Sequence, residues 1–222
     1  MKRWARKMKG WFVAPKFGNK PRNLNISWPR TIRNPQRIFF GENVHLGPNS
    51  VLKAITSTGA LMKHPENLHV EQTFQPKIVF GDRVSATGGL HVAAHSKITI
   101  EDDVMLASNV FLADALHGYD RIDIPFKYQG MIRIAPITIK QGCWIGQNVV
   151  VMPGITIGKM SVVGANSVVT KDIPSRSIAV GSPARVIKRW CERGEKWVSV
   201  GTEPVLEEQK NGDSSLSERA AG

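Results

Sequence analysis

The stretch IKQGCWIGQNVVVMPGITIGKMSVVGANSVVTKDIP, residues 139–174, repeats in steps of six. Three of the six steps have glycine in second place, and the fifth place holds Cys, Val, Ile, Ser, Ser and Ile in turn. Self-similarity at a fixed short period indicates an architecture in which each unit stacks on the next. Every step begins with an aliphatic residue: Ile139, Ile145, Val151, Ile157, Val163 and Val169.

The same rhythm recurs in three earlier runs, which begin at Phe40 (FGENVH, LGPNSV), Phe80 (FGDRVS, ATGGLH, VAAHSK) and Ile100 (IEDDVM, LASNVF, LADALH). A period of six fits neither an α-helix nor an alternating hairpin strand. It fits a short extended segment followed by a turn, three times per coil. One large apolar residue and one small residue of each side point inward to form the core, and the small second residue lets the chain bend at the corner. About eighteen residues then close a triangular coil, and parallel coils stack roughly 4.8 Å apart. The sequence therefore predicts an all-β parallel β-helix.

The remaining segments divide the chain. We expect a closing helix after the coils, because Ser182 is a plausible N-cap and Pro183 suits the first helical position. Two polar segments without the period should project as loops, where sites usually lie. The expected organisation is a basic aromatic arm over 1–37, a β-helix over 38–182 with insertions at 54–77 and 118–135, a short C-terminal helix over 183–200, and a polar mobile tail over 201–222.

Composition restricts the function classes. The net charge of +12 is concentrated in the first 22 residues, which contain no acid and interleave Trp4, Trp11, Phe12 and Phe17 with Lys and Arg. Such a segment suits an anionic membrane surface, but it also suits a solvated arm or a piece that packs on a neighbouring subunit. No apolar run of eighteen residues and no signal-like h-region occurs, so we expect an intracellular protein. The two cysteines, Cys143 and Cys191, form no CxxC motif and predict no disulfide framework.

The closing repeats carry a family resemblance. VVGANSVVTKDIPSRSIAVGSPARVIKRW (162–190), with FLADALHGYDRIDIPF (111–126) upstream, resembles the hexapeptide-repeat acetyltransferases of the maltose, galactoside and lipopolysaccharide O-acetyltransferase group. The resemblance is close over 78–190 and loose over 38–52. It implies a left-handed coil, acetyl-coenzyme A as co-substrate with no metal requirement, a homotrimer with sites between subunits, and a cytoplasmic enzyme that can lie at the inner membrane surface.

This family places a catalytic histidine at the start of the loop before the last full coils, and here that residue is His117. The resemblance implies that its imidazole removes the proton of an acceptor hydroxyl as the oxygen attacks the thioester, a task for which an imidazole is well suited. Asp114 and loop carbonyls are candidates to orient the ring. The alternative is an ordinary surface histidine. Neither Cys143, which we expect in the core of a coil, nor any serine lies in a nucleophile motif, which favours direct transfer over an acyl-enzyme.

The resemblance also implies a cofactor groove between two subunits. Ala165 and Thr170 would offer backbone groups to the pantetheine arm, while Lys171, Arg185 and Lys188 would face the phosphates. These three cations could equally form a solvated rim, and Trp144 and Gln147 could simply cover a turn. The candidate cofactor positions are Trp144, Gln147, Ala165, Thr170, Lys171, Arg185 and Lys188.

The chain departs from the sugar-acetyltransferase members at its front, where no acceptor-binding residue can be matched. This favours the lipopolysaccharide or capsule type, whose acceptors are polysaccharide sugars or lipid-linked saccharides. Two other readings remain. A zinc carbonic anhydrase on the same scaffold would use His91, His95 and His117, although their spacing does not match that family's paired HxxxxH. A non-catalytic basic β-helix would bind a membrane or nucleic acid, although no nucleic-acid motif is present and we expect no such partner.

Overall fold

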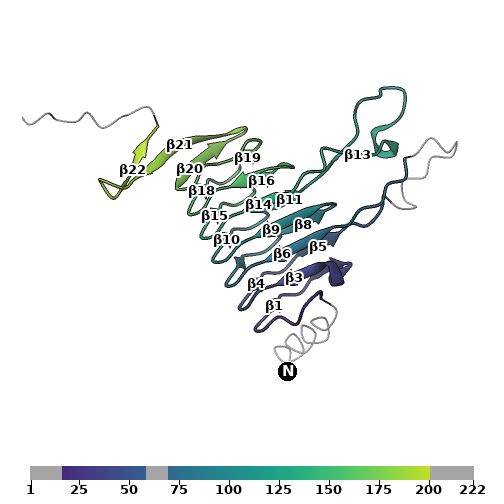
Figure 1. Cartoon of the computed structure of the whole chain (residues 1–222), viewed down its shortest axis with the longest axis horizontal. Coiled ribbons are helices and arrows are strands. Elements are labelled where there is room, and N and C mark those ends of the chain that lie inside the picture. Colours follow the sequence, from purple (N-terminus) through teal and green to yellow (C-terminus); the bar gives the residue numbers. More distant parts are fainter. Residues whose placement is uncertain (1–16, 59–69, 201–222) are drawn as a thin grey trace, which may run out of the picture.

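The computed structural model describes residues 17–58 and 70–200. Its strands stack as a column with three parallel sheets as sides, narrow at the N-terminal end and wider towards the C-terminal end (Figure 1). Side A contains β1 (Asn25–Ile26), β4 (His45–Leu46), β7 (Ser85–Ala86), β10 (Met105–Leu106), β15 (Trp144–Ile145), β18 (Val162–Val163) and β20 (Ser177–Gly181). Side B contains β2 (Arg30–Arg33), β5 (Ser50–Ala54), β8 (His91–Ala94), β11 (Phe111–Ala113), β16 (Val150–Val151) and β19 (Val168–Val169). Side C contains β3 (Ile38–Phe40), β6 (Lys77–Phe80), β9 (Lys97–Ile100), β14 (Ile137–Ile139) and β17 (Thr156–Ile157). The prediction of an all-β parallel β-helix is confirmed.

The six-residue repeat fills the core as predicted. All six residues that begin the repeats of 139–174 are at most 1% exposed, and the fifth residue of each repeat is also buried. Glycine in second place lets neighbouring coils approach closely, because a Cβ on Gly158 would lie 2.3 Å from the backbone nitrogen of Ser175. The fourth place turns the corner in a left-handed conformation, with φ of 57° at Asn148 and 59° at Asn166. Asn tolerates this region better than most residues.

The coils change length along the column. Ser85 pairs with Met105, twenty residues further along, whereas Trp144 pairs with Val162, eighteen residues further along. The longer coils have four-residue strands on side C, such as Lys97–Ile100, in place of two or three residues. This accounts for the two-residue step in the sequence rhythm between Val92 and Ile100.

The column begins earlier than predicted. β1 and β2 pair in parallel with β4 and β5, so residues 25–37 form part of a coil and not of a free arm. Phe17 is also buried, and its ring contacts Phe40 edge-on at 4.8 Å between centroids. The first coil escaped detection because few of its residues repeat the aliphatic positions, Ile26 being one. Residues 1–16 and 201–222, which hold the rest of the arm and the polar tail, lie outside the described residues.

The predicted C-terminal helix over 183–200 is wrong. After β20 the chain turns back as β21 (Ala184–Cys191) and β22 (Lys196–Ser199), which extend side A in antiparallel fashion. The edge of β20 offers unpaired backbone groups that a strand satisfies and a helix does not. Trp190 and Trp197 face each other across the new pair, with ring centroids 5.5 Å apart. Within the described residues, no helix has the length and apolarity to cross a bilayer.

We predict that inward and outward valines of one strand differ sharply in their contribution to stability. Val163 is 1% exposed and faces the core, whereas its neighbour Val162 points out from side A. Val163→Ala should lower the free energy of unfolding by about 2 kcal/mol, and Val162→Ala by clearly less. Urea denaturation of both variants measures the difference. Equal losses would contradict the assignment of inward and outward faces.

Candidate active site

The two insertions meet in one lobe where the chain turns from side B to side C, an edge we call the B–C edge. β11 is followed by β12 (Leu116–His117), which pairs antiparallel with β13 (Met131–Ile132), and a single turn of 3₁₀ helix at Phe126–Tyr128 lies between them. The described part of the other insertion lies against this hairpin, because the backbone nitrogen of Val70 donates to Tyr128 O at 3.2 Å. Figure 1 shows β13 projecting from the side of the column.

His117 stands exposed on this hairpin, directly opposite Met131. Opposed residues of an antiparallel pair share a face, and the Met131 side chain is buried against Phe74 and Ala115. Next to the pair, the backbone nitrogen of Gly118 donates to Gly130 O at 2.7 Å. No side-chain hydrogen bond of His117 is found among residues 17–58 and 70–200. The imidazole is therefore held at a defined place with its polar atoms open to a ligand.

Asp114 does not contact His117 directly. Its fully buried carboxylate accepts hydrogen bonds from the backbone nitrogens of His95 at 2.6 Å and Ser96 at 2.8 Å. The same carboxylate lies 3.4 Å from Nδ1 of His95, and that ring rests edge-on against Phe74. Asp114 thus fixes the turn after β8, beneath the lobe. The orienting role that we expected from it can only act through this turn.

The candidate cofactor residues lie at several places on the column. Trp144 lies on the outer face of side A and is 49% exposed. Gln147 and Ala165 follow β15 and β18 at the corner between sides A and B, which we call the A–B edge. The backbone nitrogen of Asn166 donates to Gln147 O at 2.8 Å, so the two corners are stacked.

Thr170 and the three cationic candidates lie elsewhere on the column. Thr170 and Lys171 follow β19 at the B–C edge, the same edge as the His117 lobe. Arg185 and Lys188 lie on β21, opposite Val180 and Ile178 of β20. All four side chains are exposed. Among the described residues, Lys171, Arg185 and Lys188 form no ion pair, so their charges are available to an anion.

Two features of the lobe escaped the sequence reasoning. One is the buried pairing of His95 with Asp114, and the other is Gln72, whose side chain contacts Met131. Gln72 lies where the six-residue period is broken, and the contact between Asp114 and His95 joins two different coils, so periodicity offered no signal for either feature.

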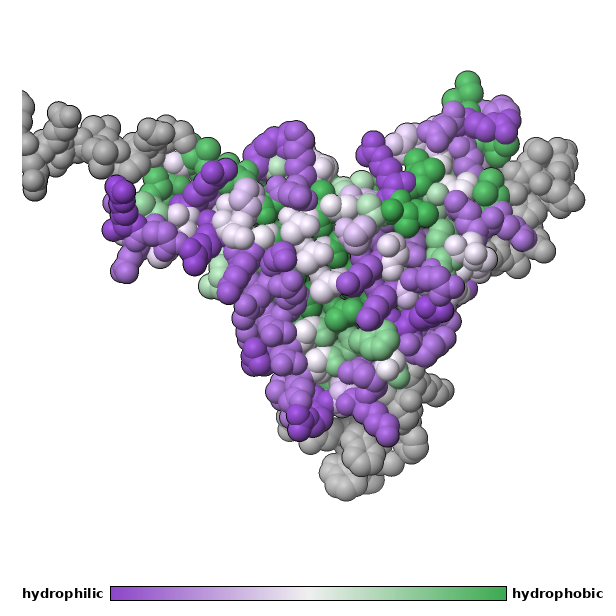
Figure 2. Space-filling model, viewed as in Figure 1, coloured by the Kyte–Doolittle hydropathy of each residue, from purple (hydrophilic) through white to green (hydrophobic). Residues whose placement is uncertain are grey.

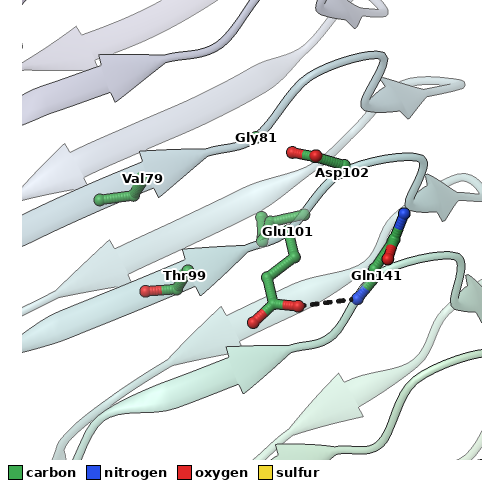
Figure 3. Close-up of a pocket in the computed structure, with 7 residues that line it drawn as sticks. Val79, Gly81, Thr99, Glu101, Asp102 and Gln141 are labelled. Atoms are coloured by element: carbon green, nitrogen blue, oxygen red, sulfur yellow. Dashed lines mark hydrogen bonds between the residues drawn. The ribbon is translucent and has the colours of Figure 1, made fainter.

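One hollow in the described part of the chain is not near His117. It measures about 310 Å³ and lies on side C, lined by Val79, Gly81, Thr99, Ile100, Glu101, Asp102 and Gln141 (Figure 3). The carboxylates of Glu101 and Asp102 in this hollow form hydrogen bonds with the backbone of neighbouring coils. Glu101 accepts from the backbone nitrogen of Gln141 at 3.0 Å, and Asp102 accepts from that of Asp82 at 2.8 Å. These contacts give the acids a structural role.

A second hollow of about 240 Å³ lies in the lobe, lined in part by Gly118, Tyr128, Gly130 and Ile132. Ile132 opposes Leu116 in the hairpin. Because side chains alternate along a strand, this face is the reverse of the one that carries His117. The hollow therefore lies behind the imidazole.

The three histidines of the zinc hypothesis do not converge within one chain. His91 lies on the outer face of side B with its ring 4.8 Å from that of Phe111, while His95 is buried beside Asp114. No cluster of three or more His, Cys, Asp or Glu suited to a metal ion occurs in the described part of the chain. The arrangement of these histidines within one chain therefore does not support a zinc carbonic anhydrase.

Cys143 lies in the core, as predicted, and is not exposed. Burial raises the pKa of its thiol to about 11, and the thiol donates to Gly158 O at 3.0 Å. A thiol rather than a thiolate is therefore present at neutral pH, and it cannot reach a substrate at the surface. This geometry gives no acyl-enzyme route through Cys143.

Comparisons with known proteins point to one family. Residues 136–171 match the family model described as bacterial transferase hexapeptide (six repeats). The chain is 32% identical over 178 residues to WbbJ of Escherichia coli strain K12, named provisionally as a lipopolysaccharide biosynthesis O-acetyl transferase; the match covers 78% of this chain and 82% of that one. It is 37% identical over 136 residues to the galactoside O-acetyltransferase of the same strain, covering 60% and 66% of the two chains.

A solved structure shows the same fold. The D94A mutant of AntD, an N-acyltransferase from Bacillus cereus in complex with dTDP and coenzyme A, superposes with a TM-score of 0.65 at 20% identity, covering 83% of this chain and 90% of that one. The column is accordingly a left-handed parallel β-helix. With a repeat match in its closing coils and a relative aligned over most of both chains, this protein belongs to the hexapeptide-repeat family of acyltransferases.

Proposed function

We propose that the protein is an acetyl-coenzyme A-dependent O-acetyltransferase, in which His117 acts as general base on a sugar hydroxyl. The carrying observation is the exposed imidazole of His117 on a hairpin whose partner strand is anchored by Met131. Two relatives named as O-acetyltransferases support the acetyl group and the oxygen acceptor. The names of these two relatives, one for galactosides and one for lipopolysaccharide biosynthesis, support a carbohydrate acceptor.

His117 supplies the chemistry that the acceptor lacks. A sugar hydroxyl hardly ionises at neutral pH, so the imidazole takes its proton while the oxygen forms a bond to the thioester carbonyl. The carbon–sulfur bond then breaks, and the imidazolium can return the proton to the departing thiolate. The oxygen attacks directly, so no covalent bond to the protein is required. Lys171, Arg185 and Lys188 suit the phosphates of coenzyme A, because the three cations are exposed.

We propose that the site is shared between subunits of a homotrimer. Trp144, Gln147 and Ala165 lie on side A or the A–B edge, whereas His117 lies beyond the opposite edge of side B. A groove formed by two chains would bring the two sets together, since one chain presents its B–C edge and its neighbour presents its A–B edge.

Side B itself is suited to packing against another chain. Its outward residues stack in register as Val51, His91, Phe111, Val150 and Val168. The pKa of His91 is lowered by burial and by the nearby charge of Lys53, which favours the uncharged ring in this stripe. Figure 2 shows apolar and weakly polar residues along the middle of the visible face, flanked by strongly hydrophilic ones.

The acceptor class and the location are further parts of the proposal. Similarity to WbbJ over most of the chain favours a sugar of a polysaccharide or a lipid-linked saccharide precursor. We place the enzyme in the cytoplasm, where acetyl-coenzyme A is available, with the basic segment before residue 17 at the inner membrane surface. That segment lies outside the described residues.

Replacement of His117 should sharply lower turnover while sparing cofactor binding. His117→Ala removes the base, so kcat should fall by a factor on the order of 10²–10⁴. Thiol release from acetyl-coenzyme A with a panel of sugar acceptors measures kcat, and calorimetry with coenzyme A measures Kd, which should stay within about twofold of the wild-type value. His45→Ala, on the outer face of β4, is the matched control and should retain activity. Full activity of His117→Ala would exclude the proposed base.

Two inactive variants should complement each other if the site is shared. Ala165→Glu places a side chain and a negative charge where the anionic cofactor would lie, and His117→Ala lacks the base. Refolding an equal mixture of the two should restore about a quarter of wild-type activity, because one site in four then takes both intact residues from different chains. Sites formed within single chains would show no recovery in the mixture.

Asp114 should act as a positioning residue for the lobe. Asp114→Ala leaves the buried backbone nitrogens of His95 and Ser96 without acceptors, so the free energy of unfolding should fall by about 3 kcal/mol. Asp120→Ala, at an exposed position of the same lobe, should change it by less than about 0.5 kcal/mol. Urea denaturation compares the two variants. Similar stability of the two variants would show that the Asp114 carboxylate does not stabilise the turn at His95 and Ser96.

A further inference from the structure

Gln72 occupies a fixed place between the two insertions. The segment around it forms a short antiparallel ribbon with residues 56–58, and Ser57 bridges Thr73. The backbone nitrogen of Thr58 donates to Gln72 O at 3.0 Å, and the backbone nitrogen of Gln72 donates to Thr58 Oγ1 at 3.0 Å. The Gln72 backbone is therefore anchored to the ribbon, and its side chain extends towards the His117 hairpin.

The Gln72 amide pairs with both polar backbone groups of a single residue. Its Oε1 accepts from the backbone nitrogen of Met131 at 2.5 Å, and its Nε2 donates to Met131 O at 3.2 Å. A primary amide carries a donor and an acceptor side by side, as a neighbouring strand would present them. The Gln72 side chain thus replaces a third strand beside β13.

This support acts on the strand that holds His117. β12 and β13 have two residues each, and Met131 is the direct partner of His117. An isolated pair of such short strands is marginally stable in water. Gln72 and the contact of Met131 with Phe74 are the described links from β13 to the rest of the lobe on this side.

We infer that Gln72 is a positioning residue, which fixes the His117 imidazole by pairing with Met131. The inference rests on the proposed function of His117 as general base. A displacement of a catalytic group by about 1 Å can lower a rate by about 100-fold. In the described part of the chain, Gln72 hydrogen-bonds to Thr58 and Met131 and to none of the candidate cofactor residues, so its effect should fall on the chemical step and not on cofactor binding.

The first test separates kcat from KM. Gln72→Leu keeps the volume of the side chain and removes both hydrogen bonds, while Gln72→Glu keeps the acceptor and removes the donor. Both should lower kcat at least about tenfold, with KM for acetyl-coenzyme A unchanged. Gln75→Leu, three residues along and exposed, is the matched control and should keep full activity. Unchanged kcat in both Gln72 variants, or an equal loss in Gln75→Leu, would overturn the inference.

The second test asks whether Gln72 acts through His117. In a His117→Ala background, Gln72→Leu should cause no further loss of the residual rate, because the group that it positions is already absent. A further tenfold loss there would assign Gln72 a role apart from His117 and contradict the inference.

The third test examines the pairing of the Gln72 amide with the Met131 backbone without measuring catalysis. Amide hydrogen exchange of the Met131 and Gly118 backbone nitrogens should become faster in Gln72→Leu than in the wild-type protein, while exchange of Ile145 in the column stays the same. Unchanged exchange at Met131 would show that the Gln72 side chain does not pair with the Met131 backbone. If exchange is faster but His117→Ala remains fully active, His117 is not the general base, and Gln72 cannot act by positioning it. The hydrogen bonds between Gln72 and Met131 would still be confirmed by that result.

Discussion

The structure depends on the register in which each coil pairs with the next. Parallel backbone hydrogen bonds place Ile100 beside Ile139 and Ile139 beside Ile157, so equivalent side chains stack along the axis in a dry core. A shift of one residue would turn these side chains outward. Coils of twenty and of eighteen residues coexist because the additional residues are taken up in the side C strands and corners without disturbing this register.

The same constraint places the candidate functional groups on the outer surface of the coils or in the insertions. Inward positions are occupied by aliphatic residues and corners by glycine or left-handed residues, so longer departures from the period can only emerge at an edge. Both long insertions leave the column at the B–C edge, and they pack on each other there. His117 and Lys171 lie on that edge, whereas Gln147 and Ala165 lie on the A–B edge. The flat side B between them favours a second chain as the element that completes the site.

The sequence predicted the parts of the fold that follow from local periodicity. The repeat positions from Ile139 to Val169 were sufficient to predict the core, the corners and the two projecting segments. The C-terminal helix was predicted from Ser182 and Pro183, but such capping signals are weaker than the demand of the open β20 edge for a strand partner. The resemblance indicated His117, yet the partners of Asp114 could not be foreseen, because its hydrogen bonds reach back nineteen residues to a different coil.

The proposed base His117 must be exposed to its substrate. An exposed residue on the lobe is not held by the parallel pairing of coils that stabilises the column. Leu112 is the last residue before His117 to be stacked in the column with a fully buried side chain. Beyond it, the chain relies on individual contacts: the Asp114 carboxylate beneath the turn, the burial of Met131 against Phe74, and the amide of Gln72. Each contact is local, and none belongs to the ladder of parallel backbone hydrogen bonds between coils. The precision of the imidazole therefore depends on a few polar and apolar side chains that the repeat itself does not require.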